Sequence, residues 1–193
     1  MTHPNVFTVN PGWRIALLDT GLNPTNVLRR AGLPDDLFGR ERETLSPAEY
    51  FGLWRAIEAE AGDPTVSLRL GSSVSMESFD PPVFAAMCSP DLNTALERLA
   101  RHKRLCAPMV MHVEVRQTET TLELEWLDDS LDPPTCLVAA ELVFFVQLPR
   151  MATRTRIEPL DVRSPEPLEA QPAYDEYFGV PVETGGGSRT TFG

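Results

Sequence analysis

The chain contains few of the residues that usually build redox, disulfide or metal sites. Among its 193 residues there are three cysteines and three histidines. Cys88, Cys106 and Cys136 form no CxxC pair, and their neighbours in the sequence are largely apolar. An odd number of cysteines in such surroundings is typical of reduced, mostly buried thiols. We therefore expect a protein of a reducing compartment, the cytoplasm, without structural disulfides.

The common catalytic and nucleotide-binding motifs are also missing. The sequence contains no GxGxxG, GxxxxGKS, GxxxxGKT, HExxH or GxSxG segment. His102 and Cys106 are four residues apart and could form half of a metal site, but a locally satisfied or exposed histidine is commoner. His3 and His112 are too few to complete a typical cluster without carboxylates. Cys88 could act as a nucleophile with His102 as its base, although a buried structural cysteine is far commoner. We expect no catalysis, no cofactor and no metal.

Basic residues are in the minority. The chain has 17 Lys and Arg against 28 Asp and Glu, a net charge of -11. Because sequence-independent DNA affinity depends on Lys and Arg contacts to phosphates, this chain by itself should bind nucleic acid poorly. Arg98, Arg101, Lys103 and Arg104 form one local basic cluster. Cations at the C-terminal end of a helix explain that cluster better than a phosphate site does.

Long hydrophobic runs are absent. The longest, Cys136 to Val146, is interrupted by Glu141 and is too short to span a bilayer. Residues 1–11 lack the basic-then-apolar pattern of a signal peptide. We therefore expect no membrane segment.

Proline, in contrast, is frequent, and its positions predict helices. Of 18 prolines, several directly follow a residue that can cap a helix. Proline at the first helical position lacks only a donor that would have no partner there, and the residue before it caps the helix. The pairs predict a string of short helices, mostly in the first half of the chain: Asn10-Pro11, Asn23-Pro24, Ser46-Pro47, Asp63-Pro64, Asp80-Pro81, Ser89-Pro90 and Asp132-Pro133.

Two helices have clear boundaries or periodicity. Residues 47–61 place apolar side chains at helical spacing, behind a capping box of Ser46 and Glu49 and before a stop at Gly62. Residues 92–105 form a second amphipathic helix with a basic end.

The second half of the chain changes to an alternating pattern. Met109–Val115 and Leu122–Trp126 alternate apolar and polar residues and predict a hairpin. Leu137–Leu148 is apolar on nearly all sides; a central strand is possible, but the length and capped start favour a buried helix. Three further elements are predicted: a strand at 156–162, a helix at 172–178 and a last strand at 180–183. Together they predict an α+β fold, with N-terminal helices packed with a small, mostly antiparallel sheet in a single domain.

Glu141 is the most unusual residue of the apolar segment. Burying a carboxylate is costly unless it is paired or protonated. Glu141 could make a polar contact inside a ligand pocket. Alternatively, it could reach water or an arginine such as Arg104 or Arg150. The same two alternatives, a pocket contact or an ordinary polar contact, apply to Gln147. We select six candidate ligand-binding residues: Phe84, Met87, Cys88, Trp126, Glu141 and Phe145. For Phe84, Met87 and Trp126, an ordinary core position is the commoner alternative.

An ordered set of segments resembles a known family. The segments are Leu28–Leu33, Tyr50–Glu58, Gly62–Pro64, Ser67–Gly71, Ser89–His102 and Tyr177–Val182. Their order and spacing resemble the N-terminal, arabinose-binding-like domain of AraC-type transcription regulators, from about Arg14 to Val182. The resemblance implies effector binding, self-association and a C-terminal part with two helix-turn-helix units. It does not imply that the effector is arabinose.

The resemblance suggests how the chain is divided. Residues 1–184 are expected to form an effector-binding and dimerisation domain. Gly185-Gly186-Gly187-Ser188 is typical of a flexible linker, so residues 185–193 are expected to lead to a DNA-binding domain outside this chain.

Two functions remain open. The first is a sensor whose unknown small effector enters a largely apolar cavity between the helices and the sheet. The second is a homodimerisation platform without a physiological ligand, with the apolar run as its interface. In both, the chain would contact DNA only through the missing domain and would have no membrane partner.

Overall fold

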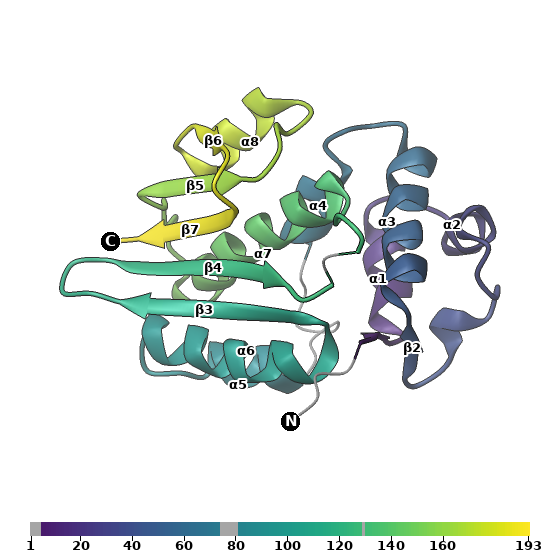
Figure 1. Cartoon of the computed structure of the whole chain (residues 1–193), viewed down its shortest axis with the longest axis horizontal. Coiled ribbons are helices and arrows are strands. Elements are labelled where there is room, and N and C mark those ends of the chain that lie inside the picture. Colours follow the sequence, from purple (N-terminus) through teal and green to yellow (C-terminus); the bar gives the residue numbers. More distant parts are fainter. Residues whose placement is uncertain (1–4, 74–80, 129) are drawn as a thin grey trace.

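The computed structural model describes residues 5–73, 81–128 and 130–193. The helices are α1 (Gly12–Asp19), α2 (Pro24–Ala31), the short 3-10 helix η1 (Leu37–Gly39), α3 (Pro47–Ala61), α4 (Val66–Ser72), α5 (Pro81–Met87), α6 (Leu92–Cys106), α7 (Thr135–Thr153) and α8 (Gln171–Phe178). The strands are β1 (Phe7–Val9), β2 (Glu43–Leu45), β3 (Met109–Val115), β4 (Thr120–Trp126), β5 (Asp161–Ser164), β6 (Val182–Thr184) and β7 (Ser188–Phe192). Figure 1 shows α1–α3 gathered on one side of the molecule and the larger sheet on the other. The predicted α+β class is confirmed.

The helix starts follow local capping chemistry. Asn23 accepts hydrogen bonds from the backbone amides at the start of α2, and Ser46 and Glu49 form the predicted capping box of α3. Gly62 ends α3 in the left-handed conformation that glycine adopts without strain. α5 begins at Pro81 and α6 begins at Leu92, both as predicted. The residue that caps α6 is Asp91, however, and not Ser89.

Two other predicted starts moved. Asp63 stabilises a turn before α4, which begins at Val66, and α7 begins at Thr135. Asp80 lies outside the described residues.

The five-stranded sheet has the order β3-β4-β7-β5-β6. The predicted hairpin is confirmed, with β3 and β4 paired from Met109 opposite Trp126 to Val115 opposite Thr120. The later strands are shifted from their predicted positions: β5 begins at Asp161 rather than near Arg156, and β6 begins at Val182. All pairings in this sheet are antiparallel except β5 with β6.

The C-terminal segment is a structural element, so the prediction of a flexible linker over 185–193 is wrong for residues 188–192. Ser188–Phe192 form β7, which is hydrogen-bonded to β4 on one side and β5 on the other (Figure 1). Gly185, Gly186 and Gly187 all have positive φ and make the turn that returns the chain from β6 into the middle of the sheet. The glycine run therefore serves a turn, and the Thr and Phe side chains after it are buried in the core.

Helix α7 is the central core helix. Leu137, Leu142, Val143, Phe145 and Val146 are completely buried, and the helix packs against α3, α4 and β7. The helix has 19 residues, and its most apolar 18-residue window has a mean hydropathy of 1.4. By length and composition it could cross a membrane, although no such segment was expected from the sequence, because only the shorter run Cys136–Val146 was considered. Because 61% of that window is buried within the fold, α7 is explained as a protein core helix.

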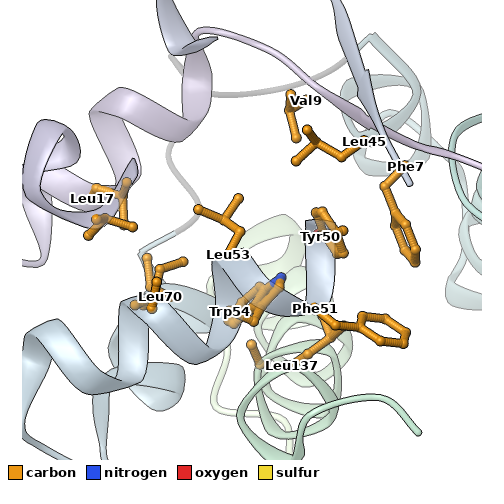
Figure 2. Packing of buried hydrophobic residues seen from close by; sticks show 14 of the residues in the cluster. Phe7, Val9, Leu17, Leu45, Tyr50, Phe51, Leu53, Trp54, Leu70 and Leu137 are labelled. Atoms are coloured by element: carbon orange, nitrogen blue, oxygen red, sulfur yellow. The ribbon is translucent and has the colours of Figure 1, made fainter. Parts of the chain in front are cut away.

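Two hydrophobic clusters meet at α7. One joins β1 and β2 to α1, α3, α4 and the start of α7, and Figure 2 shows Tyr50, Leu53 and Trp54 of α3 among the side chains that converge there. The other joins α6, α7 and α8 to the larger sheet. Trp126, at the end of β4, packs against both clusters.

Candidate functional site

A cavity of about 250 Å³ lies where the N-terminal helices meet α7. We call it the aromatic cavity. Its walls come from α1 and α3–α7, and they include Trp13, Tyr50, Trp54, Leu70, Gly71, Val83, Lys103, Ala140, Glu141 and Phe144. This cavity lies between helices, whereas the prediction placed the effector between the helices and the sheet.

Three aromatic rings form one wall of the aromatic cavity. Tyr50 and Trp54 lie one turn apart on α3, and Trp13 reaches them from α1. The ring of Trp13 is edge-on to both, with centroid distances of 5.9 Å to Tyr50 and 5.6 Å to Trp54. Trp54 is only 5% exposed, and within the described part of the chain its Nε1 has no hydrogen-bond partner. The wall therefore combines a broad apolar surface with one unused donor.

α4 lies unusually close to α7 at this wall. A Cβ atom on Gly71 would stand 2.6 Å from the carbonyl oxygen of Ala140 and 2.8 Å from the side chain of Val143. Only glycine permits that approach, because real Cβ contacts are not this short. The approach places Gly71 beside Ala140 and Glu141 at the cavity.

A half-buried ion pair faces the aromatic wall. Lys103 of α6 donates from Nζ to both carboxylate oxygens of Glu141 on α7, at 2.6 and 2.8 Å. The two side chains are 19% and 13% exposed. Nζ of Lys103 also lies 5.8 Å from the ring centroid of Phe145. Since a desolvated charge needs a partner, the pair compensates the cost of Glu141 that the sequence indicated.

The partner of Glu141 was not predicted correctly. Arg150 instead donates to the carbonyl oxygens of Ile157 and Tyr177, at 2.7 and 2.9 Å. Gln147 accepts a hydrogen bond from the Tyr177 hydroxyl at 3.0 Å. The basic cluster at the end of α6 thus contributes Lys103 to the core.

The structure brings few of the six candidate residues together. Glu141 lines the aromatic cavity, and Phe145 is completely buried beside the ion pair. Phe84 is 51% exposed on α5, Met87 packs against the sheet-side cluster, and Cys88 is exposed, contrary to the expected burial. Trp126 lines a different cavity.

Of the residues that line the aromatic cavity, sequence reasoning selected only Glu141. Tyr50 and Trp54 were assigned to the apolar face of α3, Lys103 to a helix end, and Trp13 was not considered. The available signal was the composition: two of the chain's three tryptophans fall in α1 and α3. Aromatic periodicity alone does not separate a cavity wall from a core, because both need the same buried face.

The second cavity, of about 690 Å³, lies between the start of α7, α3, β4 and the segment after β5. We call it the polar cavity, and Glu58, Trp126, Cys136, Ser164 and Tyr174 are among its lining residues. Burial and the nearby charge of Glu58 raise the pKa of the Cys136 thiol to about 12. Burial also raises the pKa of Tyr174 to about 12. Cys136 is thus a buried, protonated thiol at neutral pH, as predicted.

The described histidines, His102 and His112, lie on different elements of the fold. His112 pairs with Glu125 across the hairpin at 2.6 Å, with both side chains more than half exposed. His102 lies on α6, and His3 lies outside the described residues. Among the residues that the structure describes, no group of three or more His, Cys, Asp or Glu side chains could hold a metal ion.

Comparison with solved structures identifies a similar fold. The transcriptional regulator CdpR from Pseudomonas aeruginosa matches 95% of this chain with a TM-score of 0.59 and 19% sequence identity. The match covers 55% of the CdpR chain, so this chain spans about half the length of that regulator. No curated protein matches the sequence significantly.

A family profile assigns the sequence. The profile of the N-terminal arabinose-binding domain of AraC transcription regulators matches residues 21–189, which confirms the resemblance drawn from the sequence segments. The chain therefore belongs to the N-terminal arabinose-binding domain family of AraC transcription regulators, a regulatory and non-enzymatic family.

Proposed function

We propose that this domain binds a small-molecule effector in the aromatic cavity and thereby regulates transcription. The observation that carries the proposal is the aromatic wall of Trp13, Tyr50 and Trp54 beside the half-buried pair of Lys103 and Glu141. Small-molecule sites typically combine apolar and aromatic walls with a few polar groups that orient the ligand. The domain family supplies the expectation of an effector.

The walls indicate the chemistry of the effector. The rings favour a planar or apolar group of modest size, because the cavity holds about 250 Å³. Within the described residues, Nε1 of Trp54 lacks an acceptor, so a ligand oxygen there would gain a hydrogen bond. Lys103 and Glu141 already compensate each other, which favours an uncharged polar group at that end.

Helix α7 offers a route from the cavity to the C-terminal strand. Ala140, Glu141 and Phe144 of α7 line the cavity, and α7 also packs against β7. An effector transmits a signal only if it binds two states of the domain with different affinity. We infer that the bound effector shifts α7 relative to α1 and α3, and that β7 carries this shift toward the end of the chain.

The remaining parts of the function concern the intact regulator. We propose that it acts in the cytoplasm as a homodimer and binds DNA through a helix-turn-helix domain outside these residues. The support is the half-length coverage of CdpR and the net charge of -11, which disfavours DNA contacts by this chain. A linker to that domain would have to follow β7, because residues 188–192 are part of the sheet.

A ligand-free dimerisation platform is the second candidate. Its predicted interface, the apolar run, is the buried helix α7 and is unsuited to that role. The platform is favoured instead by exposed apolar side chains on two helices that pack together, Phe84 of α5 and Leu105 of α6.

A ligand screen separates the two candidates. Trp126→Phe leaves Trp13 and Trp54 as the tryptophan fluorophores, so the emission of this variant reports on the aromatic cavity. A metabolite that binds there should raise the melting temperature and change the emission. The response should disappear in Lys103→Met/Glu141→Leu and persist in the control Arg101→Met, whose parent side chain is 82% exposed. If a broad panel produces no response while the chain dimerises, the platform replaces the sensor.

A further inference from the structure

The polar cavity carries more negative than positive side chains. Four carboxylates line it, those of Glu58, Asp132, Glu166 and Glu169, against the single guanidinium of Arg55. Glu58 and Glu169 are close enough that the charge of Glu169, after the larger effect of burial, raises the pKa of Glu58. An uncompensated negative potential attracts a cation.

Two residues that line the same cavity each carry a buried polar atom that has no partner among the described residues. Ser164 is 1% exposed and lines the cavity, and within the described part of the chain its Oγ makes no hydrogen bond. The same holds for the buried Nε1 of Trp126 on the neighbouring wall. Ser164 lies on the core face of β5 with Val162, because buried residues alternate along that strand. Since buried polar groups are nearly always partnered, these two atoms indicate a polar occupant.

Two aromatic residues line this cavity as well. Trp126 lies at the end of β4, and Tyr174 lies on α8. Cations bind favourably over the faces of Trp and Tyr rings, and the interaction strengthens when water is excluded. The carboxylates, the rings and the unpartnered atoms therefore favour one kind of ligand.

We propose that the polar cavity is a second binding site, separate from the aromatic cavity, for a small organic cation that also carries a hydrogen-bond acceptor. The cationic group, a protonated amine or a guanidinium, binds Glu58 and Glu169. Its N–H groups or a hydroxyl satisfy Oγ of Ser164, and a carbonyl or hydroxyl oxygen accepts from Nε1 of Trp126. The cavity of about 690 Å³ accommodates such a molecule.

Argininamide is a suitable probe because it combines two cationic groups with a carbonyl acceptor. Calorimetric titration of the 193-residue chain should give a Kd below about 1 mM. Glu58→Gln/Glu169→Gln should weaken binding about tenfold or more, the loss expected for two charge-assisted contacts. Glu41→Gln/Glu176→Gln removes the same charge from exposed positions outside the cavity and should leave the Kd unchanged.

Fluorescence localises the ligand independently of those variants. Argininamide should change the emission of the parent chain, and that change should be lost in Trp126→Phe, which removes the reporter of the polar cavity. The uncharged-side-chain analogue citrulline should bind far more weakly at the same concentration.

Three results would overturn the proposal. The first is the absence of binding at millimolar argininamide. The second is an equal response to Mg²⁺, which would indicate diffuse attraction to an acidic surface. The third is binding that survives Glu58→Gln/Glu169→Gln but is lost in Lys103→Met/Glu141→Leu, because the ligand would then occupy the aromatic cavity. The first two results leave the effector of the aromatic cavity untested, and the third would support it. The metabolite screen tests that effector independently of the polar cavity.

Discussion

The two cavities beside α7 differ in how their polar groups are satisfied. In the aromatic cavity, a lysine and a glutamate compensate each other at 2.6 Å, and three aromatic rings form one wall. In the polar cavity, four carboxylates face one guanidinium. Two of its buried polar atoms also lack partners within the described residues. The comparison teaches that the charged groups of the first cavity compensate each other without a ligand, whereas those of the second do not. Stability measurements can therefore distinguish them before any ligand is known.

The largest expected effect comes from breaking the ion pair of the aromatic cavity. Lys103→Met keeps the length of the side chain but leaves Glu141 buried without its cation, and it should lower the free energy of unfolding by about 2 to 3 kcal/mol. Lys103→Met/Glu141→Leu should recover most of that loss, because no charge remains unpaired. Urea unfolding at pH 7 measures both. Arg101→Met is the matched control, and an unchanged stability of Lys103→Met would contradict the pairing.

At alkaline pH, the buried Cys136 thiol of the polar cavity should make the folding stability depend on pH. The pKa of Cys136 rises from the ordinary 9.0 to about 12 in the folded protein, so the folded state holds this proton more tightly than the unfolded state. The corresponding stability is complete below pH 9 and is lost as the pH rises toward 12. At pH 11 the loss should be about 2 kcal/mol.

Cys136→Ala tests that assignment. The variant should unfold with a shallower dependence on pH between 9 and 11, as followed by urea midpoints. The pKa of Tyr174 is also raised to about 12, so this residue contributes to the pH dependence of stability in both the parent and Cys136→Ala. Equal slopes for the parent and Cys136→Ala would show that the thiol does not contribute.

Removing an unpartnered hydroxyl should cost little. Ser164→Ala deletes a buried Oγ that has no partner among the described residues, so the stability of the ligand-free chain should be unchanged or rise by up to about 1 kcal/mol. Thr20 is a useful contrast, since its hydroxyl donates to the carbonyl of Leu17 at 2.8 Å. Thr20→Val should destabilise, and thermal unfolding measures both. A clear loss of stability in Ser164→Ala would mean that this hydroxyl already has a partner.

The smallest effect is expected for Glu58→Gln. Burial, and then the charge of Glu169, raise the pKa of Glu58 above 4.5, so the ionised carboxylate opposes folding at neutral pH. The variant should therefore be slightly more stable than the parent at pH 7, and the difference should vanish below pH 4.5, where both states are protonated. Urea midpoints at pH 4 and pH 7 test this sign. A destabilised variant at pH 7 would indicate a favourable contact of Glu58.

Local signals predicted the helical half well. The capping box of Ser46 and Glu49 and the stop at Gly62 give α3 its exact range of 47–61, because these groups act within a few residues of the helix ends. The hairpin of β3 and β4 was equally accessible, since its strands are neighbours in the sequence. The later strands were misplaced, because their pairing partners lie far away along the chain.

Of the residues that form the aromatic cavity, only Glu141 was predicted from the sequence. A carboxylate within an apolar run is costly wherever it is buried, so Glu141 was recognisable from the sequence. Its partner Lys103 is 38 residues away and was interpreted as part of a basic helix end. Trp13, Tyr50 and Trp54 form a wall only because α1 packs across α3.

The sequence by itself determined the α+β class, the bounds of α3, the hairpin, and the presence of one costly buried acid. These depend on interactions between residues close together in the chain. Tertiary structure alone decided that Ser188–Phe192 is the central strand and that the two cavities differ in charge balance. Strand order and charge compensation depend on which distant segments become neighbours, and periodicity and local capping carry no information about that choice.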